Sequence, residues 1–158
     1  MKIIFKQNKT EVILTIERTD GTTTWSKLRR GIEDHDLAHF AVEQHLEFDQ
    51  AFYGLVDSGI DIADFASTDL EKKNNIIKNL PIESIQTEFI VNLLQTEYWN
   101  SKLDTSFLIT LENILKEKNL PFPESLTEKK LSDIRKDYQS LVLKLKSLKE
   151  GESLELIF

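Results

Sequence analysis

The sequence predicts an α+β fold in which a small antiparallel sheet packs on a bundle of about five to six helices. Residues 2–28 alternate apolar and polar side chains with the period of strands. Residues 32–149 have helical period and composition, and residues 153–158, SLELIF, return to strand-like alternation. The 158 residues are expected to form a single domain, with strand hairpins over 1–30, helices bearing the histidines and aspartates over 31–66, a helical part over 67–150 and a terminal strand over 152–158.

The N-terminal strands are predicted from alternation and from one strong turn. Val12, Leu14 and Ile16 fall on one face of the second expected strand, as the two-residue period of a half-buried strand requires. Asp20 and Gly21 form a hairpin-turn signal that leads into a third strand rich in threonine. Strands are expected over 2–6, over 11–18 and from 22 onwards, with the C-terminal strand joining the same sheet.

Each expected helix is bounded by a glycine, a proline or a capping residue. Gly59 follows the second helix in the position of a C-terminal glycine. Thr68 and Glu71 have the capping-box spacing. Asp104 and Thr127 can cap the last two helices. Helices are expected over about 32–46, 50–58, 68–80, 82–100, 104–118 and 127–149, with a short turn at 62–65 and, in 82–100, an apolar stripe of Ile85, Phe89, Leu93 and Leu94.

Charge, apolar runs and cysteine content narrow the class of protein. Residues 1–30 carry seven basic and three acidic side chains, whereas residues 31–64 carry nine acidic ones, all three His and no Lys or Arg. Phosphate binding needs a concentrated basic surface, so no nucleic-acid partner is expected. No stretch approaches the ~18 apolar residues of a membrane span, so we expect no membrane partner and a cytoplasmic location. The absence of Cys excludes thiolate zinc sites and cysteine nucleophiles.

One segment has the composition of a metal site. His35, Asp36, His39 and Glu43 fall within a sector of about 100° on the first expected helix. Two imidazoles four residues apart can hold one divalent ion, for which zinc or manganese is expected. Glu43 lies about 12 Å along the axis from His35 and cannot easily join the same ion. The ligands are therefore either His35 and His39 with a distant carboxylate, for which Asp64 beside an apolar turn is preferred, or His39 with Glu43.

Asp36 is the candidate catalytic acid or base of this segment. It follows His35 at the position where the zinc-protease motif has its general-base glutamate. Aspartate is one methylene shorter and reaches less far toward a metal-bound water, so a protease is not expected. The phosphohydrolase arrangement that contains a His-Asp pair also needs a histidine well upstream of that pair, and none precedes His35. Phosphate-binding loops and the nucleophile elbow are absent as well.

The segment from Trp25 to Phe65 resembles a family of small uncharacterised bacterial proteins. Their hallmark is a strand hairpin, a helix reading HDLxHxxVE and then GFxGLxxxGxxIxDF. Ala51 stands here where the family usually has glycine. The resemblance implies no established activity. It indicates that the matching residues belong together as one set, without assigning a reaction to them. These residues are His35, Asp36, Leu37, His39, Val42, Glu43, Phe52, Gly54, Leu55, Gly59, Ile62, Asp64 and Phe65.

Three interpretations of the segment stay open. The first is a divalent-metal site, hydrolytic through an activated water. The second is a non-enzymatic interaction or adaptor protein in which His35, Asp36 and Glu43 form a buried hydrogen-bond network, with a protein partner or self-association through the helical half. The third is acid–base catalysis by the His-Asp pair without a metal. The third histidine, His45, projects roughly 120° away from His39 and is expected at the surface.

Overall fold

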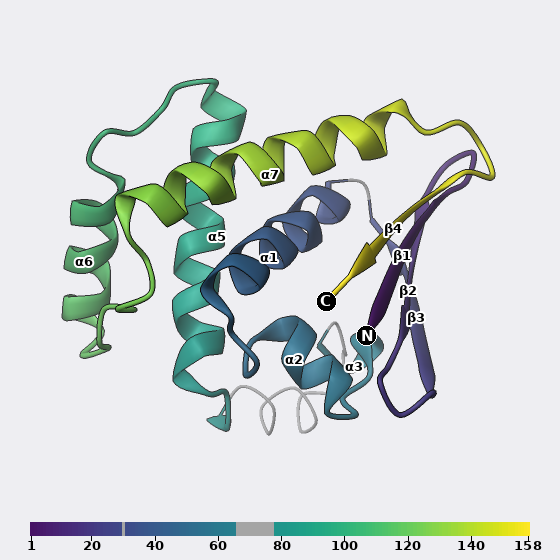
Figure 1. Cartoon of the computed structure of the whole chain (residues 1–158), viewed down its shortest axis with the longest axis horizontal. Coiled ribbons are helices and arrows are strands. Elements are labelled where there is room, and N and C mark those ends of the chain that lie inside the picture. The colour runs from purple at the N-terminus through teal and green to yellow at the C-terminus, as the bar shows by residue number, and fades with distance from the viewer. Residues whose placement is uncertain (30, 66–77) are drawn as a thin grey trace.

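The computed structural model describes residues 1–29, 31–65 and 78–158 and confirms an α+β fold (Figure 1). Four antiparallel strands form one sheet in the order β3-β2-β1-β4. The strands are β1 (Lys2–Gln7), β2 (Val12–Glu17), β3 (Thr23–Leu28) and β4 (Ser153–Ile157). The described helices are α1 (Ile32–Leu46), α2 (Phe52–Asp57), α3 (Ile62–Phe65), α5 (Ile82–Asn100), α6 (Phe107–Glu117) and α7 (Glu128–Ser147).

The sheet buries the face that the alternating sequence predicts. Phe5 pairs with Leu14 on one side and with Leu154 on the other, so inward-facing residues of three strands lie in one row. Phe5 and Leu14 are fully buried, as are Ile3 and Ile16 one pair further along. The expected return of the C-terminal strand to the N-terminal sheet is confirmed, and it brings the two chain ends together in Figure 1.

Helix α1 lies at the centre of the helical half. Its main helical neighbours are α7 and α5, and Figure 1 shows it between them and the shorter α2. Residues on several sides of α1 are buried, among them Leu37, Ala38, Val42 and Leu46. A helix covered on several sides must find partners for its ionisable residues inside the protein, because unpaired buried charges are costly.

Several helix boundaries differ in detail from the predictions. The cap by Thr127 is confirmed, since its hydroxyl accepts a hydrogen bond from the Lys130 backbone N–H at 3.2 Å. Asp104 instead accepts from the backbone N–H of Ser106 at 2.8 Å, and α6 begins only after this turn. The helix expected to start at Thr68 falls largely outside the described residues. Within the described ranges no helix is long and apolar enough to cross a membrane.

The apolar stripe expected on α5 covers only part of what that helix buries. Ile85, Phe89 and Leu93 are half-buried. The buried residues of α5 include polar ones such as Thr87 and Gln95. The reason is that α5 packs against α1 on one side and α6 on the other. The side that meets α1 therefore carries the polar groups that its histidines need.

Candidate metal site

Two histidines of α1 and one glutamate of α5 form a group that could hold a metal ion. His35, His39 and Glu88 each offer a ligand atom, and these atoms all lie within 4.8 Å of one another. The two Nε2 atoms are 3.1 Å apart. The carboxylate of Glu88 places one oxygen 3.3 Å from Nε2 of His39 and the other 4.0 Å from Nε2 of His35. The histidine spacing in the sequence thus brings both rings to one point, as expected.

Glu43 lies on the other side of His39. Its Oε1 is 3.0 Å from Nδ1 of His39, and its Oε2 accepts a hydrogen bond from the Tyr53 backbone N–H at 2.8 Å. Both carboxylate oxygens are therefore used, and neither belongs to the group around Nε2. A carboxylate in this place fixes the orientation of the imidazole ring, as partners of metal-bound histidines commonly do.

Gly54 lets α2 reach this position. A Cβ on Gly54 would lie 1.9 Å from the carbonyl oxygen of Asp49, far closer than Cβ atoms approach a backbone oxygen in proteins. The close approach at Gly54 places the Tyr53 N–H against Glu43, and the Tyr53 hydroxyl donates to the Asp36 carbonyl oxygen at 3.0 Å. The glycine, tyrosine and glutamate therefore act together to position His39.

His35 is held from the opposite side by α5. Its Nδ1 lies 2.9 Å from Oε1 of Gln95, a buried residue. His35 itself is half-buried and Glu88 is half-exposed, so this side of the group is open to solvent. The rings of His35 and His39 meet edge to face with centroids 4.7 Å apart, and Phe52 packs on His39 from α2.

The charges of the group are strongly coupled. Burial alone would lower the pKa of His39, but its interactions with Glu43 and Glu88 outweigh burial and raise the pKa to about 10. Burial lowers the pKa of His35, and the adjacent His39 lowers it further. Although burial raises the pKa of Glu88, its hydrogen bond and charge interaction with His39 hold that pKa below its usual value. The two carboxylates therefore favour the protonated, positively charged form of the His39 ring.

The other expected site residues lie outside the group. Asp36 is buried, and burial raises the pKa of its carboxyl to about 7. Asp64, the preferred distant ligand, is half-buried in α3 and is not a member. His45 is partly exposed, and its Nε2 lies 2.6 Å from Oδ2 of Asp137 on α7.

Glu88 and Gln95 were not identified from the sequence. They lie on α5, far along the chain from His35, and no local spacing connects them to it. The sequence contains one usable signal, because residues seven apart project to nearly the same side of a helix. A glutamate and a glutamine in that relation mark a polar face on α5, which could have been matched to the polar face of α1.

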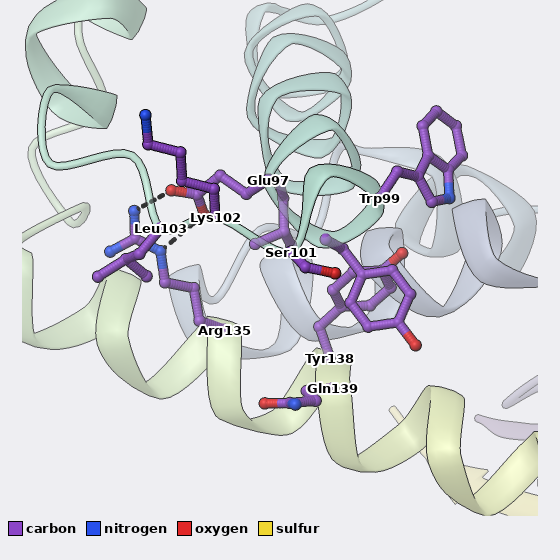
Figure 2. A pocket seen from close by; sticks show the side chains of 10 residues that line it. Glu97, Trp99, Ser101, Lys102, Leu103, Arg135, Tyr138 and Gln139 are labelled. Atoms are coloured by element: carbon purple, nitrogen blue, oxygen red, sulfur yellow. Dashed lines mark hydrogen bonds and ion pairs between the residues drawn. The ribbon is translucent and has the colours of Figure 1, made fainter.

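A separate hollow of about 610 Å³ lies where the C-terminal end of α5 meets α7 (Figure 2). Trp99 and Tyr138 are among its lining residues, and Figure 2 shows Arg135 paired with Glu97 at its edge. Nε of Arg135 donates to Oε2 of Glu97 at 2.8 Å, so this arginine is neutralised within the protein. The hollow contains no member of the histidine group, although Tyr138 is a near neighbour of Gln95.

No family model matches the chain, and no curated protein or solved structure is significantly similar to it. The function is therefore inferred from the residues and their geometry.

Proposed function

We propose that this protein binds one divalent metal ion through Nε2 of His35, Nε2 of His39 and the carboxylate of Glu88. The proposal rests on two hydrogen-bond acceptors, one facing the Nδ1 atom of each histidine ring. Glu43 and the Oε1 atom of Gln95 are acceptors, and each faces an Nδ1 atom. If each ring carries its proton on Nδ1, both Nε2 lone pairs point at the same place as the Glu88 carboxylate. Three electron-rich groups so close together need a cation between them.

The donor set favours zinc. Two histidines and one carboxylate are the protein ligands of many catalytic zinc sites, and such sites keep a further position for water. The half-exposed Glu88 leaves the group accessible to solvent. A metal held there would activate water for hydrolysis, for which Asp36 remains the candidate acid or base. Manganese is the second candidate metal, because mixed nitrogen and oxygen ligands also suit it.

A second function is supported by the charge on His39. With its pKa raised to about 10, His39 can itself be the cation, because a proton on Nε2 satisfies both His35 and Glu88. The same residues then form a buried structural network, and the protein acts as a non-enzymatic interaction or adaptor protein. Metal analysis distinguishes the two functions.

The test uses protein purified without a His tag. We expect about one zinc ion per chain, and zinc at a hundred times its dissociation constant should stabilise the fold by about 2.7 kcal/mol. Glu88→Gln should lose most of this effect, and because Glu88 is half-exposed this variant should still fold. His45→Ala on the same helix is the matched control and should bind as the wild type does. Absence of stoichiometric metal, together with no stabilisation by zinc or manganese, would refute the proposal.

A further inference from the structure

Gln95 connects the histidine group to α7. Its Oε1 atom lies 2.9 Å from Nδ1 of His35, while its Nε2 atom is buried without a hydrogen bond. The hydroxyl of Tyr138, also buried, is likewise without one. The Gln95 amide is nevertheless close enough to the Tyr138 phenol to lower its pKa, against burial and the nearby Asp34 carboxylate, which raise it. The amide thus lies between an imidazole and a hydroxyl.

The oxygen and the NH₂ group of the Gln95 amide require opposite tautomers of the His35 ring. With Oε1 toward Nδ1, Gln95 accepts a proton from the ring, so the proton is on Nδ1 and the Nε2 lone pair is free. With the amide turned over, its NH₂ group donates to Nδ1, and the ring proton must then sit on Nε2. A protonated Nε2 cannot bind a metal ion. The orientation of one amide therefore decides whether His35 can be a ligand.

Tyr138 can accommodate either orientation. A phenol hydroxyl both donates and accepts, so it can accept from the amide NH₂ group or donate to the amide oxygen. Tyr138 in turn lies near Asp34, whose Oδ2 is paired with Nζ of Lys146 at 3.1 Å and whose Oδ1 is buried without a hydrogen bond. The polar side chains that surround the amide thus come from all three helices that meet around the site.

We propose that Gln95 is a positioning residue that sets the tautomer of His35 and thereby its competence as a metal ligand. The Tyr138 hydroxyl, buried without a hydrogen bond of its own, is the neighbouring polar group for the other end of the amide. This inference rests on the proposed metal site, which it deepens. It also predicts a property of the metal-free protein, the position of the ring proton on His35, which can be measured without any metal.

Three variants test this role. Gln95→Leu keeps the approximate size but removes the acceptor, and we expect zinc affinity to fall about ten- to a hundredfold, the usual effect of losing the partner of a metal-bound histidine. Gln95→Glu can accept from both Nδ1–H and the Tyr138 hydroxyl, so it should restore the affinity. Gln86→Leu is the matched control, because Gln86 is a buried glutamine of the same helix whose Nε2 donates to the Pro121 carbonyl oxygen at 2.7 Å, away from the site.

Nitrogen NMR of the His35 ring gives a second readout, which a purely structural role would not move. In the metal-free Gln95→Glu variant the His35 ring should carry its proton on Nδ1. This prediction does not depend on whether the protein can bind zinc. Equal zinc affinity in the wild type, Gln95→Leu and Gln86→Leu would overturn the positioning role and leave the metal site intact. A ring of the Gln95→Glu variant with its proton on Nε2 would overturn it as well. Failure of the wild type to bind zinc would instead refute the metal site. The position of the ring proton on His35 would still test the role of Gln95.

Discussion

Two histidines of α1 form histidine–carboxylate pairs that differ mainly in their surroundings, one with Glu43 on the same helix and one with Asp137 on α7. In the first, His39 and Glu43 are 4% and 0% exposed and their nearest nitrogen and oxygen are 3.0 Å apart. In the second, His45 and Asp137 are 22% and 61% exposed and the corresponding distance is 2.6 Å. The shorter contact thus belongs to the exposed pair. Distance alone does not rank the two, because water and salt screen the exposed pair and cannot reach the buried one.

Burial makes the first pair depend on a supporting structure. Burial raises the pKa of the Glu43 carboxyl, and the hydrogen bonds from the His39 ring and the Tyr53 N–H act against that rise. Glu88 adds a further negative group on the far side of the same ring. The exposed pair needs no comparable support. Asp137 contacts His45 from the solvent-exposed side of α7.

The largest expected difference is seen when each carboxylate is removed. Glu43→Ala should destabilise the fold by about 3–5 kcal/mol, because it leaves a buried imidazole and a backbone N–H without their partner. Asp137→Ala should cost at most about 1 kcal/mol, the usual range for an exposed pair. Urea denaturation measures both. Similar losses in the two variants would show that burial does not separate the pairs.

A smaller effect is expected when the support of the buried pair is disturbed without touching it. Gly54→Ala adds a Cβ that must move away from the Asp49 carbonyl oxygen, so α2 shifts and the Tyr53 N–H withdraws from Glu43. We expect a loss of about 1–3 kcal/mol, the usual cost of overpacking. If Gly54→Ala has wild-type stability, the approach of α2 is not what holds Glu43 in place.

The pH dependence of the metal-free protein sharpens the comparison further. The folded-state pKa of His39, about 10, lies above the unfolded value of about 6.5, so the folded protein holds a proton that the unfolded chain releases. The resulting stability is complete below pH 6.5 and is lost as the pH rises toward 10. The slope for one proton is at most ~1.4 kcal/mol per pH unit.

Unfolding in urea across this pH range, with a chelator present, should show the decline in the wild type and in His45→Ala. It should be absent in His39→Asn, which cannot take up the proton. A decline that persists unchanged in His39→Asn would assign the proton to another group.

Local patterns account for what the sequence predicts correctly. The period of two over β1 to β3 and the capping hydroxyl of Thr127 act over a few residues, so both could be recognised without the fold. The same is true of the two imidazoles one helical turn apart, His35 and His39, which do meet as expected. In each case the residues that form the pattern lie within a few positions of one another in the sequence.

The remaining site residues depend on tertiary packing. Glu88 joins the histidines only because α5 lies against α1, and nothing near Glu88 in the sequence indicates that contact. Asp64 is predicted as the distant ligand because it ends a short apolar turn that packing would hold, and α3, which contains this turn, packs on β3. Glu43 is predicted as a metal ligand on the same helix face as His39, whereas its position at Nδ1 of His39 depends on α2, whose approach at Gly54 cannot be inferred from helical spacing.

The smallest expected effect concerns the exposed pair itself. A double-mutant cycle between His45 and Asp137 should give a coupling of about 0.2–1 kcal/mol at low salt. In about 1 M salt, where the screening length falls to roughly 3 Å, most of this coupling should vanish. The corresponding cycle between His39 and Glu43 should keep its coupling in the same salt, because ions cannot enter between two side chains that the fold encloses. An exposed coupling that resists salt would mean that its 2.6 Å contact, rather than burial, governs the strength of such pairs in this protein.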